Sequence, residues 1–231
     1  MTTAYTTDIL HLGDGKELSL VFFKHASLAI SIEGKWIYND PVSDFADYSK
    51  LQKADLILIG HHHYDHLDIN AIREILKSDT QIVCDKTSAT MLKEEGIEAK
   101  FLSPEESYTP FEGLLIESIR AYNTSDCALQ FHPKEREDIG FVLNYGSTRI
   151  YIAGDGEPTP EMLSLKGIDI AFLPVNQPYT MKVEQAVAAV KSLKPAIFYP
   201  YHYGQVEEIT DLELLKRELE GVCEVRIRGM E

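Results

Sequence analysis

The run of histidines from Gly60 to His66 is the part of the sequence best suited to chemistry. It reads Gly60-His61-His62-His63-Tyr64-Asp65-His66 and directly follows the apolar residues 56–59. If those apolar residues form a strand, the turn after it can fold four side chains around a cation, namely His61, His63, Asp65 and His66. Imidazole nitrogens and a carboxylate suit a divalent first-row metal such as zinc, manganese or iron. An expression tag would stand at a terminus, so we expect a metal site.

Two residues far along the chain are further candidate ligands. Asp155 lies in Ala153-Gly154-Asp155-Gly156, where small neighbours permit a tight turn that presents the carboxylate at a strand end. His202 likewise follows an apolar strand and precedes Gly204. Taken alone, Asp155 is equally typical of a turn, and His202 is more typical of a core or rim histidine. The histidine-rich segment favours the ligand interpretation for both.

The elements expected to position these residues are mainly short strands, because apolar runs bounded by Gly, Pro, Asn or Asp are typical of strands. Amphipathic spacing predicts helices at 68–77 and 183–193, and a third helix is expected to begin after Asp211 and end at Glu220. The expected strands are 18–23, 27–33, 35–38, 55–59, 81–84, 100–102, 114–119, 140–144, 148–153, 169–174, 196–200 and 223–227.

The order of these elements repeats within the chain. The pattern that starts at the first hairpin starts again at Gly140, and Asp155 stands 115 positions after Asp40, at the end of the corresponding hairpin. Two copies of one unit predict a pseudo-twofold α/β domain of two packed sheets with helices outside, in which the strand ends of both copies converge. Because no linker is visible, residues 1–231 are expected to form a single domain.

The segment 122–138 is predicted to be a long loop between strands. Structureless connections of this length usually carry ligands or act as lids. The loop contains Lys134 and Arg136, which are candidates to receive a phosphate or carboxylate group of a substrate, although charged loop residues are most often simply solvated.

Composition excludes several classes of function. With 44% hydrophobic residues the chain can build a core, and its net charge of −15 disfavours nucleic acids and anionic membranes as partners. No apolar run approaches the roughly 20 residues of a membrane helix, and residues 1–8 do not resemble a signal peptide. Three widely spaced cysteines fit a reducing compartment. We therefore expect a cytoplasmic protein with a small-molecule substrate.

The motif His61-x-His63-x-Asp65-His66, followed by Gly154-Asp155 and His202, resembles the metallo-β-lactamase-fold hydrolases over most of the chain. Within that superfamily, other segments resemble a bacterial branch related to ascorbate-6-phosphate lactonase and the N-acyl phosphatidylethanolamine phospholipase. These segments are His25-Ala26-Ser27, Asp40-Pro41, Ala121-Tyr122-Asn123, His132-Pro133-Lys134 and the sequence from Arg149 to Asp155.

The resemblance implies a four-layer αββα sandwich of α/β class with one or two divalent metal ions. Zinc is the first expectation, with manganese or iron as alternatives, and a homo-oligomer would follow the habit of the family. By position, the implied ligands are His61 and His63 for the first metal, Asp65, His66 and His202 for the second, and Asp155 as a bridge.

One position departs from the pattern of the family, which usually supplies a further histidine about thirty residues before the bridging aspartate. Here that residue is Asn123, and an amide oxygen is a weaker ligand than imidazole. Either the first site is depleted or His132 in the same loop replaces the histidine. His132 is equally open to interpretation as a substrate-binding residue or as an ordinary loop residue.

These observations predict metal-assisted hydrolysis of a small ester, lactone or phosphodiester. Asp65 is expected to orient the attacking water or to shuttle its proton beside His66. His25 is a candidate orienting or substrate residue, and Asp40 and Asp85 are candidate acceptors for the second N–H group of ligating imidazoles.

Glu157 is expected to add negative charge near the metal site, which would favour cations over anionic substrates. Because of Asn123, two alternatives remain. One is an iron-dependent redox enzyme of the same fold, and the other is a degenerate metal-binding module without catalysis.

Overall fold

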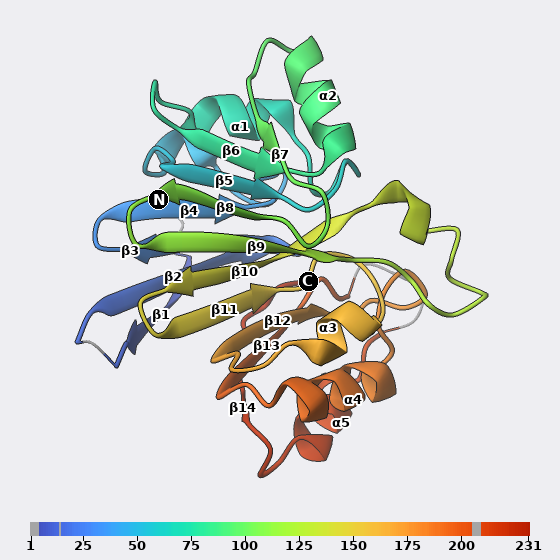
Figure 1. Cartoon of the computed structure of the whole chain (residues 1–231). Coiled ribbons are helices and arrows are strands. Elements are labelled where there is room, and N and C mark those ends of the chain that lie inside the picture. The colour runs from blue at the N-terminus through green and yellow to red at the C-terminus, as the bar shows by residue number, and fades with distance from the viewer. Residues whose placement is uncertain (1–4, 14, 205–208) are drawn as a thin grey trace. The chain divides into compact units, whose positions relative to one another are not determined.

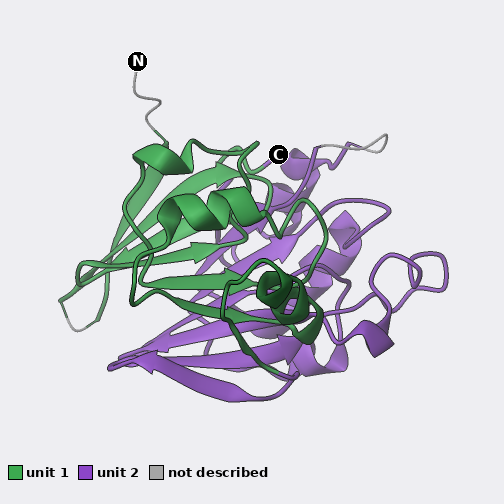
Figure 2. Cartoon of the chain, turned by 90° about the horizontal axis from the view of Figure 1, so that it is seen from above, with its two compact units in different colours: residues 1–102, 228–230 green, residues 103–227, 231 purple. Residues whose placement is uncertain are grey.

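The computed structural model describes residues 5–13, 15–204 and 209–231. The chain divides into two compact units, coloured separately in Figure 2. Unit 1 comprises residues 1–102 with 228–230, and unit 2 comprises residues 103–227 with 231. Because the main boundary falls between the two halves of the repeat, each half of the sequence forms a unit with its own sheet.

Unit 1 contains one seven-stranded sheet (Figure 1). Its strands, in order across the sheet, are β1 (Thr6–His11), β2 (Glu17–Lys24), β3 (Ser27–Ile32), β4 (Lys35–Asn39), β5 (Leu56–Ile59), β6 (Gln81–Cys84) and β7 (Lys100–Phe101). Neighbours from β1 to β4 are antiparallel, and those from β4 to β7 are parallel. All four residues of β5 are completely buried, so both faces of this strand are covered and its sequence is an unbroken apolar run.

The helices of unit 1 are η1 (Tyr48–Lys50), α1 (Ile69–Ile75) and α2 (Lys86–Glu94). The Asp68 side chain accepts hydrogen bonds from the backbone N–H groups of Asn70 and Ala71, which begins α1 as the sequence predicted. Ile72 and Ile75 of α1 are completely buried in one apolar cluster with residues of β5 and β6. Burying each isoleucine contributes roughly 1.5–3 kcal/mol, so packing fixes the helix to the sheet.

Unit 2 repeats this arrangement with a second seven-stranded sheet. Its strands are β8 (Ser107–Phe111), β9 (Leu114–Arg120), β10 (Ile139–Tyr145), β11 (Thr148–Ile152), β12 (Ile170–Pro174), β13 (Ile197–Tyr201) and β14 (Glu224–Val225). Neighbours from β8 to β11 are antiparallel, and those from β11 to β14 are parallel. Each unit therefore has the same sequence of antiparallel and parallel pairings, which confirms the predicted internal repeat.

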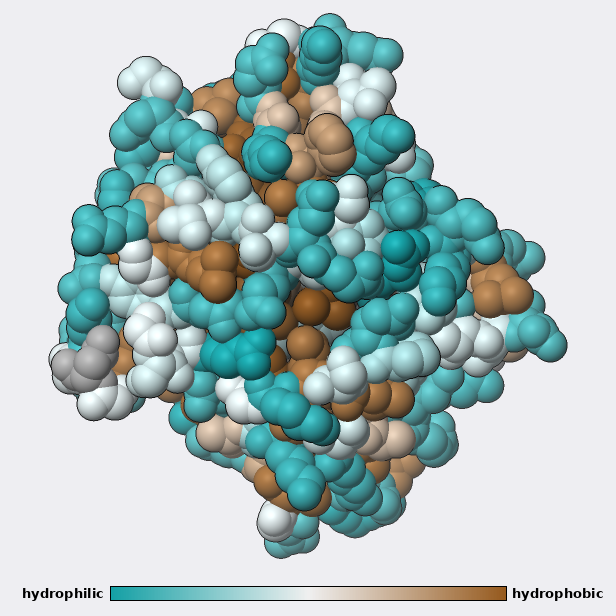
Figure 3. All heavy atoms as spheres, viewed as in Figure 1, coloured by the Kyte–Doolittle hydropathy of each residue, from teal (hydrophilic) through white to brown (hydrophobic). Residues whose placement is uncertain are grey.

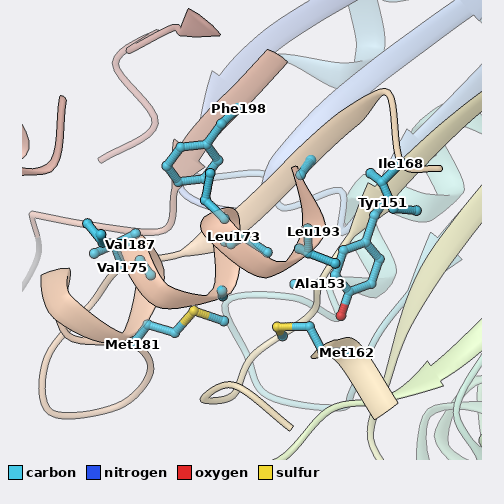
Figure 4. Packing of buried hydrophobic residues seen from close by; sticks show 14 of the residues in the cluster. Tyr151, Ala153, Met162, Ile168, Leu173, Val175, Met181, Val187, Leu193 and Phe198 are labelled. Atoms are coloured by element: carbon cyan, nitrogen blue, oxygen red, sulfur yellow. The ribbon is translucent and has the colours of Figure 1, made fainter. Parts of the chain in front are cut away.

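The helices of unit 2 are η2 (Lys134–Arg136), α3 (Pro160–Ser164), α4 (Val183–Leu193) and α5 (Leu212–Glu218). α4 has the predicted bounds, and Asp211 caps α5 by accepting a hydrogen bond from the backbone N–H of Leu214. Figure 4 shows part of the apolar cluster that joins these helices to the sheet, including Met162, Leu173 and Phe198.

Six elements of the described residues are additional to the sequence-based expectation, namely β1, β8, α2, α3 and the short helices η1 and η2. β1 and β8 are edge strands with several exposed residues, so their sequences lack a strong apolar pattern. Between them, α2 and α3 bury only Ser88, Leu92 and Met162. Both helices therefore contribute few apolar residues to the core, which makes them hard to recognise from the sequence.

The face shown in Figure 3 is covered mainly by hydrophilic side chains, with hydrophobic ones in small groups. Among the described residues, none of the helices has the length and apolar composition of a membrane span.

Candidate metal centre

The histidine-rich segment of unit 1 forms a tight turn directly after β5. The turn is closed by a hydrogen bond from the His66 backbone N–H to the His63 carbonyl oxygen, 3.0 Å long. The ring centroid of His61 lies 4.1 Å from that of His66 and 4.4 Å from that of His63. His61 and His66 are buried and His63 is half-buried, so three imidazoles are gathered at the end of one buried strand.

Asp40 fixes the orientation of the His66 ring. Its Oδ2 atom lies 2.8 Å from Nδ1 of His66, and its Oδ1 atom accepts a hydrogen bond from the Gly60 backbone N–H. A carboxylate can only accept, so Nδ1 of His66 carries the proton and Nε2 keeps the lone pair that a metal needs. Asp40 follows β4 in the left-handed conformation, with φ of 43°.

His25 stands beside Asp65 at the same end of the sheet. The Nε2 atom of His25 lies 3.1 Å from Oδ2 of Asp65, and His25 is 2% exposed whereas the Asp65 side chain is 20% exposed. One ligand atom from each of His25, Asp65 and His66 lies within 4.8 Å of the others. Asp65 is thus held by a buried histidine and also reaches solvent.

In unit 2, Asp155 lies between two histidines. Its Oδ2 atom is 3.1 Å from Nε2 of His202 and 3.3 Å from Nε2 of His132, and all three residues are buried. A charge-assisted hydrogen bond between nitrogen and oxygen is usually about 2.7–2.9 Å long. Two atoms that each lie about 2.0–2.1 Å from a tetrahedral zinc ion are separated by roughly 3.3 Å, which agrees with the spacing here. Each pair of Asp155 with a histidine therefore has a spacing that fits two ligands of a divalent metal.

The turn that carries Asp155 requires glycine on both sides. Gly154 has φ of 65°, and a Cβ atom on it would lie 2.7 Å from the Ile139 carbonyl oxygen. A Cβ atom on Gly156 would lie 2.7 Å from the backbone nitrogen and oxygen of Tyr122. The small residues noted in the sequence thus allow the backbone to pass close to its neighbours.

His202 follows β13 and also has a left-handed backbone, with φ of 52°. Its Nδ1 atom lies 3.2 Å from the side-chain amide of Asn176, which follows β12. Asn176 is a contact that the sequence did not indicate, because the pairing joins two strand ends 26 residues apart. Left-handed backbone costs energy in residues other than glycine and is often found at functional sites.

Asn123 and His132 belong to one organised loop. The Nδ2 atom of Asn123 donates hydrogen bonds to the carbonyl oxygens of Ala128 and Tyr179, and its backbone N–H donates to the His132 carbonyl. The Nδ1 atom of His132 lies 3.1 Å from the same Tyr179 carbonyl oxygen. Asn123 therefore holds the loop through its nitrogen, and its buried Oδ1 atom accepts no hydrogen bond from the described residues.

Glu157 is buried, and its charge is directed at the loop. Burial alone would raise its pKa, but hydrogen bonds from Gln185, Ser125 and Thr124 lower the pKa below its ordinary value of 4.5. The sequence-based expectation treated this carboxylate as extra negative charge at the metal site. The lowered pKa keeps the carboxylate ionised, and hydrogen-bond donors of the loop stabilise its negative charge.

The two basic loop residues differ in their surroundings. Arg136 forms hydrogen bonds to both carboxylate oxygens of Asp138, so part of its guanidinium group is already paired with an anion. Lys134 is half exposed, and its Nζ atom lies 3.3 Å from the Tyr122 hydroxyl and 3.8 Å from the Glu161 carboxylate. Lys134 also lines a cavity of about 310 Å³, together with Tyr122, Asn123, Thr124, Leu129, Pro133 and Glu135.

Asp85 has a structural role in unit 1. Its carboxylate accepts hydrogen bonds from the backbone N–H groups of Thr87 and Ser88 and thereby caps α2. This capping role accounts for a buried carboxylate at the end of β6.

The comparisons with known proteins agree with the fold. A family model described as a beta-lactamase superfamily domain matches residues 19–202. The chain belongs to this family. The predicted fold class, the α/β sandwich of the metallo-β-lactamases, is thereby confirmed, and so is the superfamily named from the motifs.

Similar proteins bear the same class of activity in their names. A UPF0173 metal-dependent hydrolase of Thermoplasma acidophilum is 30% identical over 201 residues, which cover 84% of this chain and 87% of the relative. A Parabacteroides distasonis protein assigned as a metal-dependent hydrolase has a structure that matches with a TM-score of 0.91 and 43% identity, covering 99% of this chain and 100% of that one. Igni18, a metallo hydrolase of Ignicoccus hospitalis, matches with a TM-score of 0.78 and 25% identity over 92% of this chain and 95% of its own. The expected enzyme class, a metal-dependent hydrolase of the metallo-β-lactamase superfamily, is confirmed.

Proposed function

We propose that the protein cleaves a small ester, lactone or phosphodiester with a metal-activated water. The observation that carries the proposal is the Asp155 carboxylate, whose Oδ2 atom faces Nε2 of His132 at 3.3 Å and Nε2 of His202 at 3.1 Å. Buried imidazole and carboxylate groups at this spacing are a ligand set for a divalent metal.

The proposed metal ligands come from both halves of the repeat. His132 is included because its Nε2 atom faces Asp155, whereas the Asn123 nitrogen is engaged with backbone carbonyls. We propose one or two ions, with zinc first and manganese or iron as alternatives. The ligands assigned are His61, His63, Asp65 and His66 in unit 1, and His132, Asp155 and His202 in unit 2.

The proposed chemistry divides between the ion and the protein. When bound, a divalent metal supplies Lewis acidity and lowers the pKa of water from 15.7 to about 7. Asp65 orients that water and takes its proton, because its carboxylate is partly exposed and is held by His25 at 3.1 Å. The contact with Asp40 at Nδ1 fixes the orientation and tautomer of the His66 ring, so Asp40 and His25 act as positioning residues.

The substrate is proposed to be a small molecule that reaches the cavity lined by Lys134. A volume of about 310 Å³ is at the lower end of the range for small-molecule pockets. The Lys134 ammonium group stands over the Tyr122 ring at 4.8 Å from its centroid, so it is placed to bind a carboxylate or phosphate of the substrate. The net charge of −15 supports a partner other than nucleic acid.

The organisation of the protein is part of the proposal. Residues 1–231 are proposed to act as one hydrolase domain, because the family match at 19–202 includes residues of both units. Cytoplasmic localisation and a homo-oligomeric state are carried forward as proposals from the composition and from the habit of the family.

The first experiment measures the metal content of tag-free protein by inductively coupled plasma mass spectrometry. The test variant is His61→Ala with His63→Ala, and His11→Ala is the control because the His11 side chain is 75% exposed on β1. We expect one or two equivalents of zinc or manganese in the wild type and the control, and a clear loss in the double variant. Hydrolysis of an ester, lactone and phosphodiester panel should disappear with the metal.

Other outcomes would separate the alternatives. Iron with visible absorbance and no hydrolysis of the panel would favour the redox enzyme. A wild type that holds no metal tightly would overturn the proposal and favour a degenerate site without catalysis. Retained turnover in the double variant would exclude its histidines from the mechanism.

A further inference from the structure

Glu157 is the acidic residue that connects the turn bearing Asp155 to the loop bearing His132. It is 2% exposed and lies two positions after Asp155. Its Oε2 atom accepts hydrogen bonds from the Thr124 backbone N–H at 2.7 Å, the Thr124 hydroxyl at 3.0 Å and the Ser125 backbone N–H at 2.6 Å. A single carboxylate oxygen therefore gathers three donors at the start of the loop.

The backbone reinforces this connection. The Glu157 N–H donates to the Tyr122 carbonyl oxygen at 3.0 Å. Gly156 approaches the same residue so closely that a Cβ atom would lie 2.7 Å from its backbone atoms. The turn and the first residues of the loop are thus held together by four hydrogen bonds and a close backbone contact.

The loop transmits this constraint to His132. Asn123 follows Tyr122 directly, and its N–H donates to the His132 carbonyl oxygen at 2.8 Å. Both the Asn123 amide and the His132 Nδ1 atom contact the Tyr179 carbonyl, at 2.8 Å and 3.1 Å. Glu157 is thus connected to His132 through the start of the loop, and His132 in turn faces Asp155.

We propose that Glu157 is a positioning residue that sets the separation between the Asp155 carboxylate and the His132 imidazole and so controls metal affinity. The proposal rests on the proposed function, in which both are metal ligands. A carboxylate is suited to this role because it can accept several hydrogen bonds from backbone and hydroxyl donors, and those to an ionised acceptor are the stronger ones.

The test is the affinity of metal-stripped protein for Co²⁺, measured by chelator competition and by the visible spectrum of the bound ion. Glu157→Gln keeps the size of the side chain but replaces one acceptor oxygen with a donor, and Glu157→Ala removes every hydrogen bond that the carboxylate accepts. Substitution of a residue that supports a metal ligand typically lowers metal affinity by about 10–100-fold. We expect about 10-fold weaker binding for the glutamine variant, a larger loss for alanine, and an altered spectrum.

Glu117→Gln is the matched control, because Glu117 on β9 also accepts hydrogen bonds, from Asn144 and Arg149, but has no part in the loop. It should lower the melting temperature without changing Co²⁺ affinity. If Glu157→Gln behaves as this control does, the positioning role is wrong. If wild-type protein itself binds no Co²⁺, the proposed function fails instead.

Discussion

The Nδ1 atom of His66 lies 2.8 Å from the Oδ2 atom of Asp40, and both residues are buried. This contact fixes the proton on Nδ1 and places the lone pair on Nε2, the atom proposed to bind the metal. Asp40→Asn should lower metal affinity and hydrolysis by about 10–100-fold, because an amide is a weaker acceptor and can present its donor to the ring. Asparagine tolerates the left-handed backbone at this position, with φ of 43°, so the fold is preserved.

Isothermal titration with Zn²⁺ and circular dichroism check this prediction. Asp47→Asn, at an exposed site in the same unit, is the control and should bind metal as the wild type does. Unchanged Zn²⁺ affinity in Asp40→Asn would show that Asp40 is only a structural acceptor.

Two substitutions at His202 separate its backbone strain from its chemistry. Both His202→Gly and His202→Ala should abolish hydrolysis, because each removes the proposed ligand. The glycine variant should be more stable than the alanine variant by about 1 kcal/mol, because alanine is strained in the left-handed conformation and glycine is not. Urea unfolding of the metal-free proteins measures the difference. Equal stabilities would contradict backbone strain, and retained activity would contradict the ligand role.

His132 and Asn123 should respond differently to truncation. His132→Ala should lower metal content because its Nε2 atom faces Asp155. Asn123→Ala should mainly destabilise the protein, by roughly 1–3 kcal/mol, because it removes one hydrogen-bond donor from each of the buried carbonyl oxygens of Ala128 and Tyr179. Metal analysis and thermal unfolding of both variants check this assignment. A larger loss of metal in Asn123→Ala would reverse the two roles.

Tyr151→Phe should leave stability unchanged or raise it by about 1 kcal/mol. The Tyr151 hydroxyl is buried in the apolar cluster of Figure 4, which includes Met162, and has no hydrogen-bond partner among the described residues. An unpaired buried hydroxyl costs about 1–3 kcal/mol. Tyr38→Phe is the control and should be destabilising, because the Tyr38 hydroxyl donates to the Gln52 carbonyl. Urea unfolding compares the two variants, and a clear loss of stability in Tyr151→Phe would contradict the prediction.

Asp55 should make unit 1 sensitive to acid. Burial alone would raise its pKa, but hydrogen bonds from Lys77, the Trp36 backbone N–H and Lys35 lower the pKa below its ordinary value of 3.8. A lowered pKa gives stability that is present in full above the ordinary value and is lost as pH falls through the lowered one. Asp55→Asn should therefore lower the melting temperature at pH 7, and the difference from wild type should narrow below pH of about 4. A constant difference from pH 7 to pH 3 would rule out this linkage.

The sequence by itself determined the family, the repeat and most strands of the two sheets. The spacing of His61, His63, Asp65 and His66 is short enough for local geometry to bring them together after one buried strand. Asp155 could be predicted as a candidate ligand because the glycines on either side of it indicate a turn at a strand end. α4 was predicted with its observed bounds because it buries a long apolar face. These features depend on residues close together in the sequence, so residue spacing and apolar periodicity are enough to predict them.

The tertiary structure decided which distant residues meet. His25 and Asp65 are 40 positions apart, and no local pattern joins them. The choice between Asn123 and His132 as the residue facing Asp155 depends on how a long loop folds, and that fold depends on buried hydrogen bonds to Glu157 and Tyr179. Long-range pairing of polar groups follows from packing the whole unit, because each buried group must find a partner wherever the chain brings one.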